Sequence, residues 1–330
     1  MHVYRDEDAD LGLIRERRVA VIGYGNQGRA QALNLRDSGV AVTVGLPEGS
    51  ASRARAGADG FGVATAAQAC AAADLAVMLA ADETHGRIYG EDVAPNLPSG
   101  ASLVFGHGLS IRFGLVEPRP DLDVVLVAPK GPGTALRAEY EKGGGLISLF
   151  AVHQDATGRA EATALAYAAA IGSGRAGILR TSFAEECEAD LFNEQAVLWG
   201  AIPELIHAGF ETLVDAGFAP EIAYFECLTE VKLIADLIYE RGIAGMREAI
   251  SNTAEFGALK GGSRIVTADT RTEMRRILRE VRAGLFVREL IADAESGHKR
   301  LRASRAEAAA HPIERVRDRL RSLAAGRGDG

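Results

Sequence analysis

The chain has 330 residues, of which 47% are hydrophobic and 25% charged, and this composition suits a globular protein of one large domain or two ordinary ones. A net charge of -8 argues against a nucleic-acid-binding surface, and three cysteines without paired spacing argue against a disulfide framework. The longest apolar run, 75–81, is too short to cross a bilayer, and the charged N-terminus does not resemble a signal peptide. We therefore expect a cytoplasmic protein with neither a nucleic-acid nor a membrane partner.

The first half of the chain alternates short apolar runs with helical stretches. A helix follows the first clear strand through Leu35 and stops near Gly39. This alternation is typical of an α/β protein with a parallel sheet covered on both faces. The expected strands are 18–22, 40–46, 75–79, 102–105, 123–128 and 146–152.

From about Thr181 onward the pattern is helical, with long apolar stretches at 185–208 and 220–241. The second stretch is apolar nearly all round, so it must be buried on several sides, and we expect a partner chain to cover it. Pro203 should kink or end the first stretch unless it lies in the first turn of a helix.

A glycine-rich motif directly follows the first strand and opens a helix. In a dinucleotide-binding turn, Gly23 would make the tight turn, Gly25 would let the backbone approach a pyrophosphate, and Gly28 would let the helix pack on the strand. The N–H groups at the helix N-terminus would then bind the phosphates. The predicted cofactor-binding residues here are Gly23, Tyr24, Gly25, Asn26, Gln27 and Gly28.

The end of the second strand usually separates NAD from NADP, because an acid there binds the ribose 2′-OH whereas arginine and hydroxyls bind a 2′-phosphate. Ser50 and Ser52 could donate to a phosphate and Arg53 could supply charge, although either serine could instead be an ordinary N-cap. Glu48, an acid in the same segment, argues instead for NADH. The segment favours NADPH and leaves NADH open.

Two pairs of carboxylates are spaced four residues apart on predicted helices. Asp190 and Glu194 form one pair, and Glu226 and Glu230 the other, so each pair lies on one helix face. Unpaired carboxylates are costly to bury within apolar stretches, and four of them would neutralise two divalent cations, for which oxygen ligands favour Mg²⁺. Alternatively, these acids are solvated or pair with basic residues such as Lys232.

These features occur together in ketol-acid reductoisomerases, and the chain resembles the short, class I form of that family along nearly its whole length. The ordered matches make the resemblance highly specific. They are the segments 6–11, 21–25, 127–133, 151–155, 190–195, 221–228, 243–246, 250–255 and 311–314.

The resemblance implies roles for individual residues. Asp190 and Glu194 match metal ligands, with Asp190 bridging two Mg²⁺ ions. Glu226 and Glu230 match acids that complete the metal and substrate site from the partner subunit, with Glu230 also a candidate base. The remaining matches are Ser251 at the substrate carboxylate, Lys130 as a catalytic lysine near the metals, His107 as a catalytic histidine beside the nicotinamide, and Asp82 and Gly133 at the cofactor.

The resemblance also implies a Rossmann domain over 1–181 and a knotted helical domain over 182–330 that binds metal and substrate and dimerises. The protein would be a homodimer with shared sites, or a higher oligomer. The expected reaction is Mg²⁺-dependent alkyl migration followed by NADPH reduction, which converts 2-acetolactate or 2-aceto-2-hydroxybutyrate to a 2,3-dihydroxy-3-methyl acid for valine and isoleucine. The alternatives are a paralogue acting on a related 2-hydroxy-3-keto acid in secondary metabolism, a metal-independent 3-hydroxyacid dehydrogenase, or a silent nucleotide-binding regulator.

The sequence departs from the family pattern near both expected sites. Pro47 stands where the family usually has an arginine, which removes one contact to a 2′-phosphate. Trp199 replaces a small residue in the metal-bearing region and could reshape the substrate pocket or pack on the outer surface. The other departures are Arg29, Gln31, Ala81, Leu109, Ser110 and Arg112.

Overall fold

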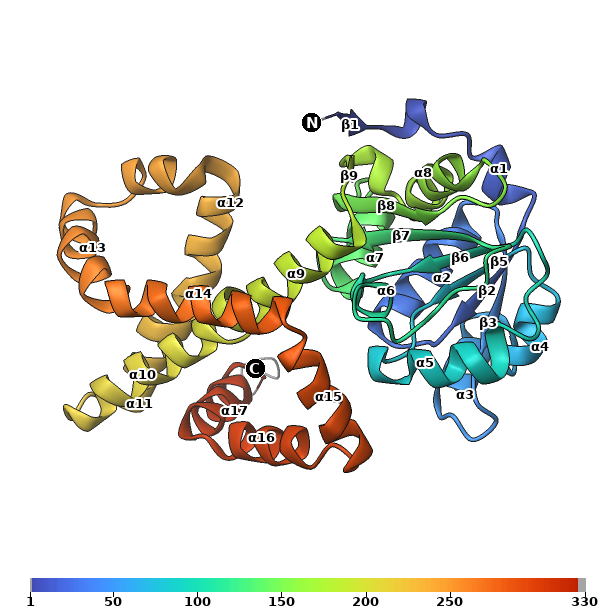
Figure 1. Cartoon of the computed structure of the whole chain (residues 1–330). Coiled ribbons are helices and arrows are strands. Elements are labelled where there is room, and N and C mark those ends of the chain that lie inside the picture. Colours follow the sequence, from blue (N-terminus) through green and yellow to red (C-terminus); the bar gives the residue numbers. More distant parts are fainter. Residues whose placement is uncertain (1, 326–330) are drawn as a thin grey trace. The chain divides into compact units, whose positions relative to one another are not determined.

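The structure is a computed structural model that describes residues 2–325. The chain divides into two compact units, Met1–Ala189 and Asp190–Gly330, and each is described by itself. In Figure 1 the first unit runs from blue to green and the second from yellow to red. The fold is thus a mixed α/β unit followed by an all-helical one, as the sequence predicts.

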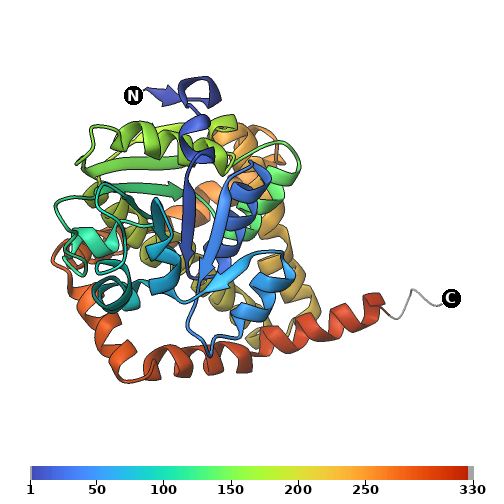
Figure 2. The ribbon, with the colours of Figure 1, turned by 90° about the vertical axis from the view of Figure 1, so that its right-hand side faces the viewer.

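The first unit is built on one sheet with the strand order β1-β9-β8-β7-β6-β5-β2-β3-β4, and most of its strands are labelled in Figure 1. Figure 2 shows the same ribbon turned by 90°. Its strands are β1 Val3–Tyr4, β2 Arg18–Ile22, β3 Ala41–Gly45, β4 Gly62–Ala64, β5 Leu75–Met78, β6 Ser102–Phe105, β7 Asp123–Pro129, β8 Ser148–Gln154 and β9 Ile178–Arg180.

The sheet is parallel, as predicted, except at two strand pairs. Strands β7, β6, β5, β2, β3 and β4 run parallel, but β8 lies antiparallel to β7, and β1 antiparallel to β9. The start of β8 pairs with the end of β7, Ser148 with Pro129, so the intervening helix returns the chain to the edge it left and β8 must run backwards. Strands β1, β4 and β9 span only two or three residues, too few to show a periodicity in the sequence.

Helices cover both faces of this sheet, as predicted. Along β2, Val19 and Val21 join one hydrophobic cluster, whereas Ala20 and Ile22 join the other, because successive side chains point to opposite faces. Both faces are therefore buried, which explains the nearly continuous apolar runs. The helices of this unit are α1 Gly12–Arg15, α2 Asn26–Asp37, α3 Ser52–Ala58, α4 Ala66–Ala71, α5 His85–Ile88, α6 Leu109–Arg112, α7 Gly133–Glu141 and α8 Ala160–Ala170.

Helix α9, Phe183–Asn193, runs from the first unit into the second, and wide π-type turns interrupt the helical chain twice after it. The stretch 185–208 is therefore helical, as predicted, but a wide turn divides it into two helices. Pro203 is the third residue of α10, where its missing N–H is no loss, and so it ends no helix. The elements are η5 Glu194–Leu198, α10 Ala201–Asp215, α11 Pro220–Tyr224, η6 Phe225–Thr229, α12 Glu230–Glu248, α13 Asn252–Ile265, α14 Ala268–Arg282, α15 Leu285–Glu295, α16 Lys299–Ala310 and α17 Pro312–Ala325.

The second unit leaves much apolar surface uncovered within one chain. A small core forms around Phe210, Ala223 and Ile313. By contrast, α12 and α13 have no buried residue, and Leu233 and Leu259 are 63% and 67% exposed. The single chain therefore buries only the start of the apolar stretch at 220–241, around Ala223. Among residues 2–325, no helix is long and apolar enough to cross a membrane.

Candidate functional site

The glycine motif forms the turn between β2 and α2. Gly23 has a φ of +104°, and a Cβ there would lie 2.5 Å from the backbone N of Ala80. A Cβ on Gly28 would lie 2.4 Å from the Gly23 carbonyl oxygen, so the helix can approach the turn only without a side chain. A Cβ on Gly25 would meet nothing within 4 Å. Sterics explain the first and third glycines, while the second faces open space, as a ligand approaching the backbone requires.

The polar residues of the motif join α2 to the start of α7. The Asn26 Oδ1 atom accepts a hydrogen bond from the backbone N–H of Thr134 at 3.0 Å, and Gln27 donates to the Gly131 carbonyl at 2.8 Å. A Cβ on Gly133 would lie 2.2 Å from the Asn26 carbonyl oxygen, so glycine is needed for this close approach. The two helix N-termini therefore lie side by side next to the glycine turn.

Tyr24 points into the protein rather than toward a ligand. Its ring is 2% exposed and its hydroxyl donates to Asp59 at 2.8 Å. Burial, together with that carboxylate, raises the pKa of Tyr24. The Tyr24 side chain thus packs under the glycine turn, and only the Tyr24 backbone is available to a cofactor.

The loop after β3 places its polar residues differently from expectation. The Arg53 guanidinium donates to the carbonyls of Leu46 and Ala64, at 2.8 and 3.3 Å, so it ties together the ends of β3 and β4. Ser50 accepts from the backbone N–H of Ser52 at 3.3 Å, and neither serine caps α3 through its side chain. The Ser50 hydroxyl is thus held at the start of α3 by the backbone, while the Arg53 guanidinium is bound to backbone carbonyls.

Three predicted residues follow three neighbouring parallel strands. Asp82 lies beyond β5, His107 beyond β6, and Lys130 directly after β7. The carboxyl ends of parallel strands meet at one edge of the sheet, where ligands of such folds bind. His107 lies between two acids, with Nδ1 3.9 Å from Asp82 and Nε2 3.9 Å from Glu186.

Glu186 organises this edge, although the sequence reasoning missed it. Its side chain is 1% exposed, and it accepts hydrogen bonds from Lys130 Nζ at 2.6 Å and from the backbone N–H of Gly108 at 2.8 Å. A buried carboxylate stays charged only with such partners. A signal was present, because Phe183 and Cys187 mark the buried face of α9 and Glu186 lies on it.

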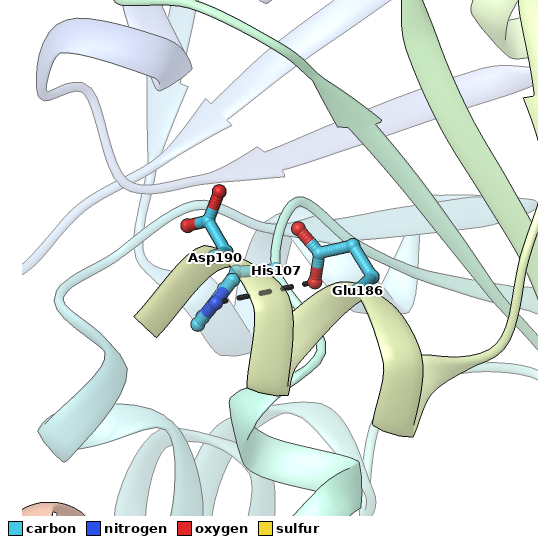
Figure 3. Close-up of side chains that lie close together, drawn as sticks. All are labelled: His107, Glu186 and Asp190. Carbon is cyan, nitrogen blue, oxygen red and sulfur yellow. Dashed lines mark ion pairs between the residues drawn. The ribbon is translucent and has the colours of Figure 1, made fainter. Parts of the chain in front are cut away.

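Asp190 lies one turn beyond Glu186 on α9 and joins the same group (Figure 3). One ligand atom each from His107, Glu186 and Asp190 lie within 4.8 Å of one another. Two carboxylates and an imidazole can bind a divalent cation, and the carboxylate oxygens suit Mg²⁺. Glu194 is a further four residues along, at the start of the wide turn η5, and is not in this group of three.

The other predicted ligands belong to the second unit and lie on its surface. Glu226 is exposed within η6, and Glu230 is exposed as the first residue of α12. Lys232, the suggested alternative partner for these acids, forms its ion pair with Asp236. Ser251 is exposed and caps α13 by accepting from the backbone N–H of Ala254 at 3.1 Å.

A dinucleotide turn, a buried acid with its lysine, and a histidine at the carboxyl edge of a doubly covered sheet define a Rossmann-type enzyme class. Residues 13–177 match "Acetohydroxy acid isomeroreductase, NADPH-binding domain", and residues 183–325 match "Ketol-acid reductoisomerase, C-terminal domain". The chain belongs to the ketol-acid reductoisomerase family.

Solved structures agree with this assignment. An NADH-preferring ketol-acid reductoisomerase from an uncultured archean is 41% identical, with a TM-score of 0.95 over 98% of this chain and 99% of that one. A semialdehyde dehydrogenase NAD-binding protein from Cupriavidus necator (18% identity, TM-score 0.63, 81% and 99% covered) shares the fold alone. The same holds for a 1-pyrroline-5-carboxylate reductase from Streptococcus pyogenes (15% identity, TM-score 0.54, 81% and 98% covered).

Proposed function

We propose that this chain converts 2-acetolactate and 2-aceto-2-hydroxybutyrate to 2,3-dihydroxy-3-methyl acids, with NADPH and two Mg²⁺ ions, in valine and isoleucine biosynthesis. Family membership over both units supports the reaction class. The observation that carries the proposal is the group of His107, Lys130, Glu186 and Asp190 at the carboxyl edge of the sheet. A metal-independent dehydrogenase would have no use for the clustered carboxylates.

The residues present fit the divalent cations of the proposal. Asp190 and Glu186 offer carboxylate oxygens, Glu194 follows one turn later, and Glu226 and Glu230 would complete the set from a partner subunit. When bound, the metal supplies Lewis acidity that lowers the pKa of a substrate hydroxyl, and the nicotinamide supplies a hydride.

The protein's own residues hold charges in place. Lys130 and the Gly108 N–H both donate to Glu186, so the oxygens of this buried acid keep a fixed direction. Asp82 and Glu186 flank the two ring nitrogens of His107 and orient the imidazole beside the nicotinamide position. In the proposal Glu230 accepts the proton of the substrate hydroxyl, and Ser251 binds the substrate carboxylate.

The cofactor would lie across the glycine turn. The adjoining N-termini of α2 and α7 present N–H groups to its pyrophosphate, and Ser50 and Ser52 lie at the position that reads the ribose. We favour NADPH because the loop after β3 supplies two serine hydroxyls, Ser50 and Ser52, as donors to a phosphate. The similar archean enzyme is NADH-preferring, so both cofactors belong in the test.

The uncovered apolar faces of α12 and α13 support a homodimer in which residues 182–330 form the shared metal and substrate site. Residues 1–181 would bind the nucleotide. Trp199 is 64% exposed, so within one chain it does not narrow a pocket and gives no support to a paralogue with a changed substrate.

The test follows absorbance at 340 nm with purified protein, 2-acetolactate, Mg²⁺ and either NADPH or NADH, with EDTA as the metal control. Mass spectrometry of the product separates the rearranged dihydroxy acid from simple reduction. Metal-dependent oxidation with the rearranged product is expected. If protein shown to bind the nucleotide oxidises neither cofactor, the proposed substrate is wrong.

A further inference from the structure

Four arginines lie on the elements around the glycine turn: Arg29, Arg53, Arg55 and Arg137. The guanidinium groups of all but Arg55 are bound to acids or to strand carbonyls. Arg29 binds Asp59 through two hydrogen bonds of 2.7 and 3.0 Å, which hold the pKa of Asp59 at about 2. Arg137 forms ion pairs with Asp37 and Glu141, at 2.7 and 2.8 Å. Because acids already balance these two charges, and because Arg53 is bound to strand carbonyls, none of the three is well placed to serve a ligand.

Arg55 is the fourth, and its contacts are all with neutral groups. Its Nη2 atom donates to the Tyr24 carbonyl at 2.6 Å and lies 3.4 Å from Ser52 Oγ, and its guanidinium lies 5.7 Å from the centre of the Tyr24 ring. Within residues 2–325 no ion pair to a carboxylate involves it. A guanidinium held by a carbonyl, a hydroxyl and a ring keeps its full charge.

The surroundings of Arg55 are those of a nucleotide-binding edge. It lines a cavity of about 390 Å³ together with Gly25, Asn26 and the start of α7 at Gly133. Arg55 also lies three residues after Ser52 on α3, so the two side chains share one helix face. Its charge therefore lies beside both the glycine turn and the hydroxyls expected to meet the ribose.

We propose that Arg55 is the cation that recognises a 2′-phosphate on the adenosine of the cofactor. This rests on the proposed use of NADPH. A phosphate dianion is bound most strongly by donors that carry a positive charge, and Ser50 and Ser52 are neutral donors. Pro47 has neither an N–H nor a charge, and the Arg53 head is tied to Leu46 and Ala64. Arg55 alone joins positive charge to that pair of serines.

The competing explanation is purely structural, because the hydrogen bond to the Tyr24 carbonyl could only brace the glycine turn. The two roles differ in which ligands they affect. A brace supports every nucleotide equally, whereas a phosphate cation supports only those with a 2′-phosphate. Two fragments, 2′,5′-ADP and 5′-AMP, differ in that phosphate alone and need neither substrate nor metal.

The experiment measures binding of both fragments by calorimetry to the full-length protein and to Arg55→Gln. The variant should weaken 2′,5′-ADP about tenfold and 5′-AMP less than about twofold, as expected for loss of one charge-assisted contact. Arg180→Gln is the control, because Arg180 is 56% exposed, pairs with Glu161 and lies on β9, near the edge of the sheet opposite to β3 and β4. This variant should change neither affinity. Arg55→Lys, which keeps the charge, should restore part of the preference.

Equal weakening of both fragments would show that Arg55 is a brace and would overturn the inference, as would an unchanged preference in Arg55→Gln. If the wild-type protein itself binds both fragments equally, the NADPH assignment fails, and the role of Arg55 fails with it. If the wild-type protein prefers 2′,5′-ADP and Arg55→Gln keeps that preference, the role of Arg55 is refuted while the NADPH assignment stands. Raising the salt concentration should weaken 2′,5′-ADP binding more in the wild type than in Arg55→Gln.

Discussion

The carboxyl edge of the sheet and the start of α12 both carry acids, but they hold them in opposite ways. Glu186 is buried and fixed by Lys130 and the Gly108 N–H, so its position is set within one chain. Glu226 and Glu230 are exposed, beside apolar faces that the chain does not cover. A buried acid costs free energy unless it is paired, whereas an exposed acid costs little even without a partner. The position of Glu186 is therefore fixed within one chain, whereas the exposure of Glu226 and Glu230 fits the homodimer proposed above.

The largest effect should come from Asp190, which the sequence predicts as a metal ligand and whose carboxylate lies within 4.8 Å of His107 and Glu186 in the structure. Asp190→Asn keeps the shape and removes the charge, so isomerisation and reduction should both fall to background in Mg²⁺. Glu185→Gln is the matched control, because Glu185 is exposed on the same helix and its carboxylate accepts a hydrogen bond from the nearby Thr181 hydroxyl. Near-normal turnover by Asp190→Asn would contradict the metal assignment.

Glu186→Gln and Glu226→Gln test the comparison directly. Both should reduce turnover, by about a hundredfold or more if each positions charge at the reacting atoms. Only Glu186→Gln should also lower the melting temperature, since it weakens the buried hydrogen bonds that Glu186 accepts from Lys130 Nζ and the Gly108 N–H. Differential scanning calorimetry beside initial rates separates the two. Equal loss of stability in both variants would mean that Glu226 is buried in the working protein before substrate binds.

An oligomer test addresses the uncovered face of α12. Leu233→Glu places a charge on a side chain that is 63% exposed in the single chain, so the fold should survive while the dimer weakens. Light scattering should show a shift toward monomer, and activity should fall with it because Glu226 and Glu230 would no longer reach a partner. Arg305→Glu, on an exposed position of α16, is the control for an added negative charge. A variant that is fully monomeric yet fully active would refute the shared site.

Sequence patterns predicted the parts of this molecule that rest on local sterics. The glycine turn could be predicted because Gly23 and Gly28 are positions where a Cβ would collide with backbone. The direction of β8 could not, because it depends on where α7 returns the chain. Glu186 was missed because a single acid on an apolar helix face acquires its meaning only from Lys130 and His107, 56 and 79 residues away. Arg55 and Arg53 look equivalent in the sequence, and only the structure shows that Arg53 binds the carbonyls of Leu46 and Ala64, whereas Arg55 lines the cavity beside the glycine turn.

The smallest effect concerns the ion pair that braces the glycine turn from below. Hydrogen bonds from Arg29, with help from the Tyr24 hydroxyl, lower the pKa of Asp59 to about 2, below its ordinary 3.8. A carboxyl whose pKa is lower in the folded state stabilises the fold fully above the ordinary value, and this stabilisation disappears as pH falls through about 2. Arg29→Gln should therefore be less stable than the wild type at pH 6, and the difference should shrink between pH 4 and pH 2, where Asp59 becomes protonated in both proteins. Urea denaturation at several pH values measures this, and a difference that stays constant down to pH 2 would mean that Arg29 stabilises the turn by packing rather than by charge.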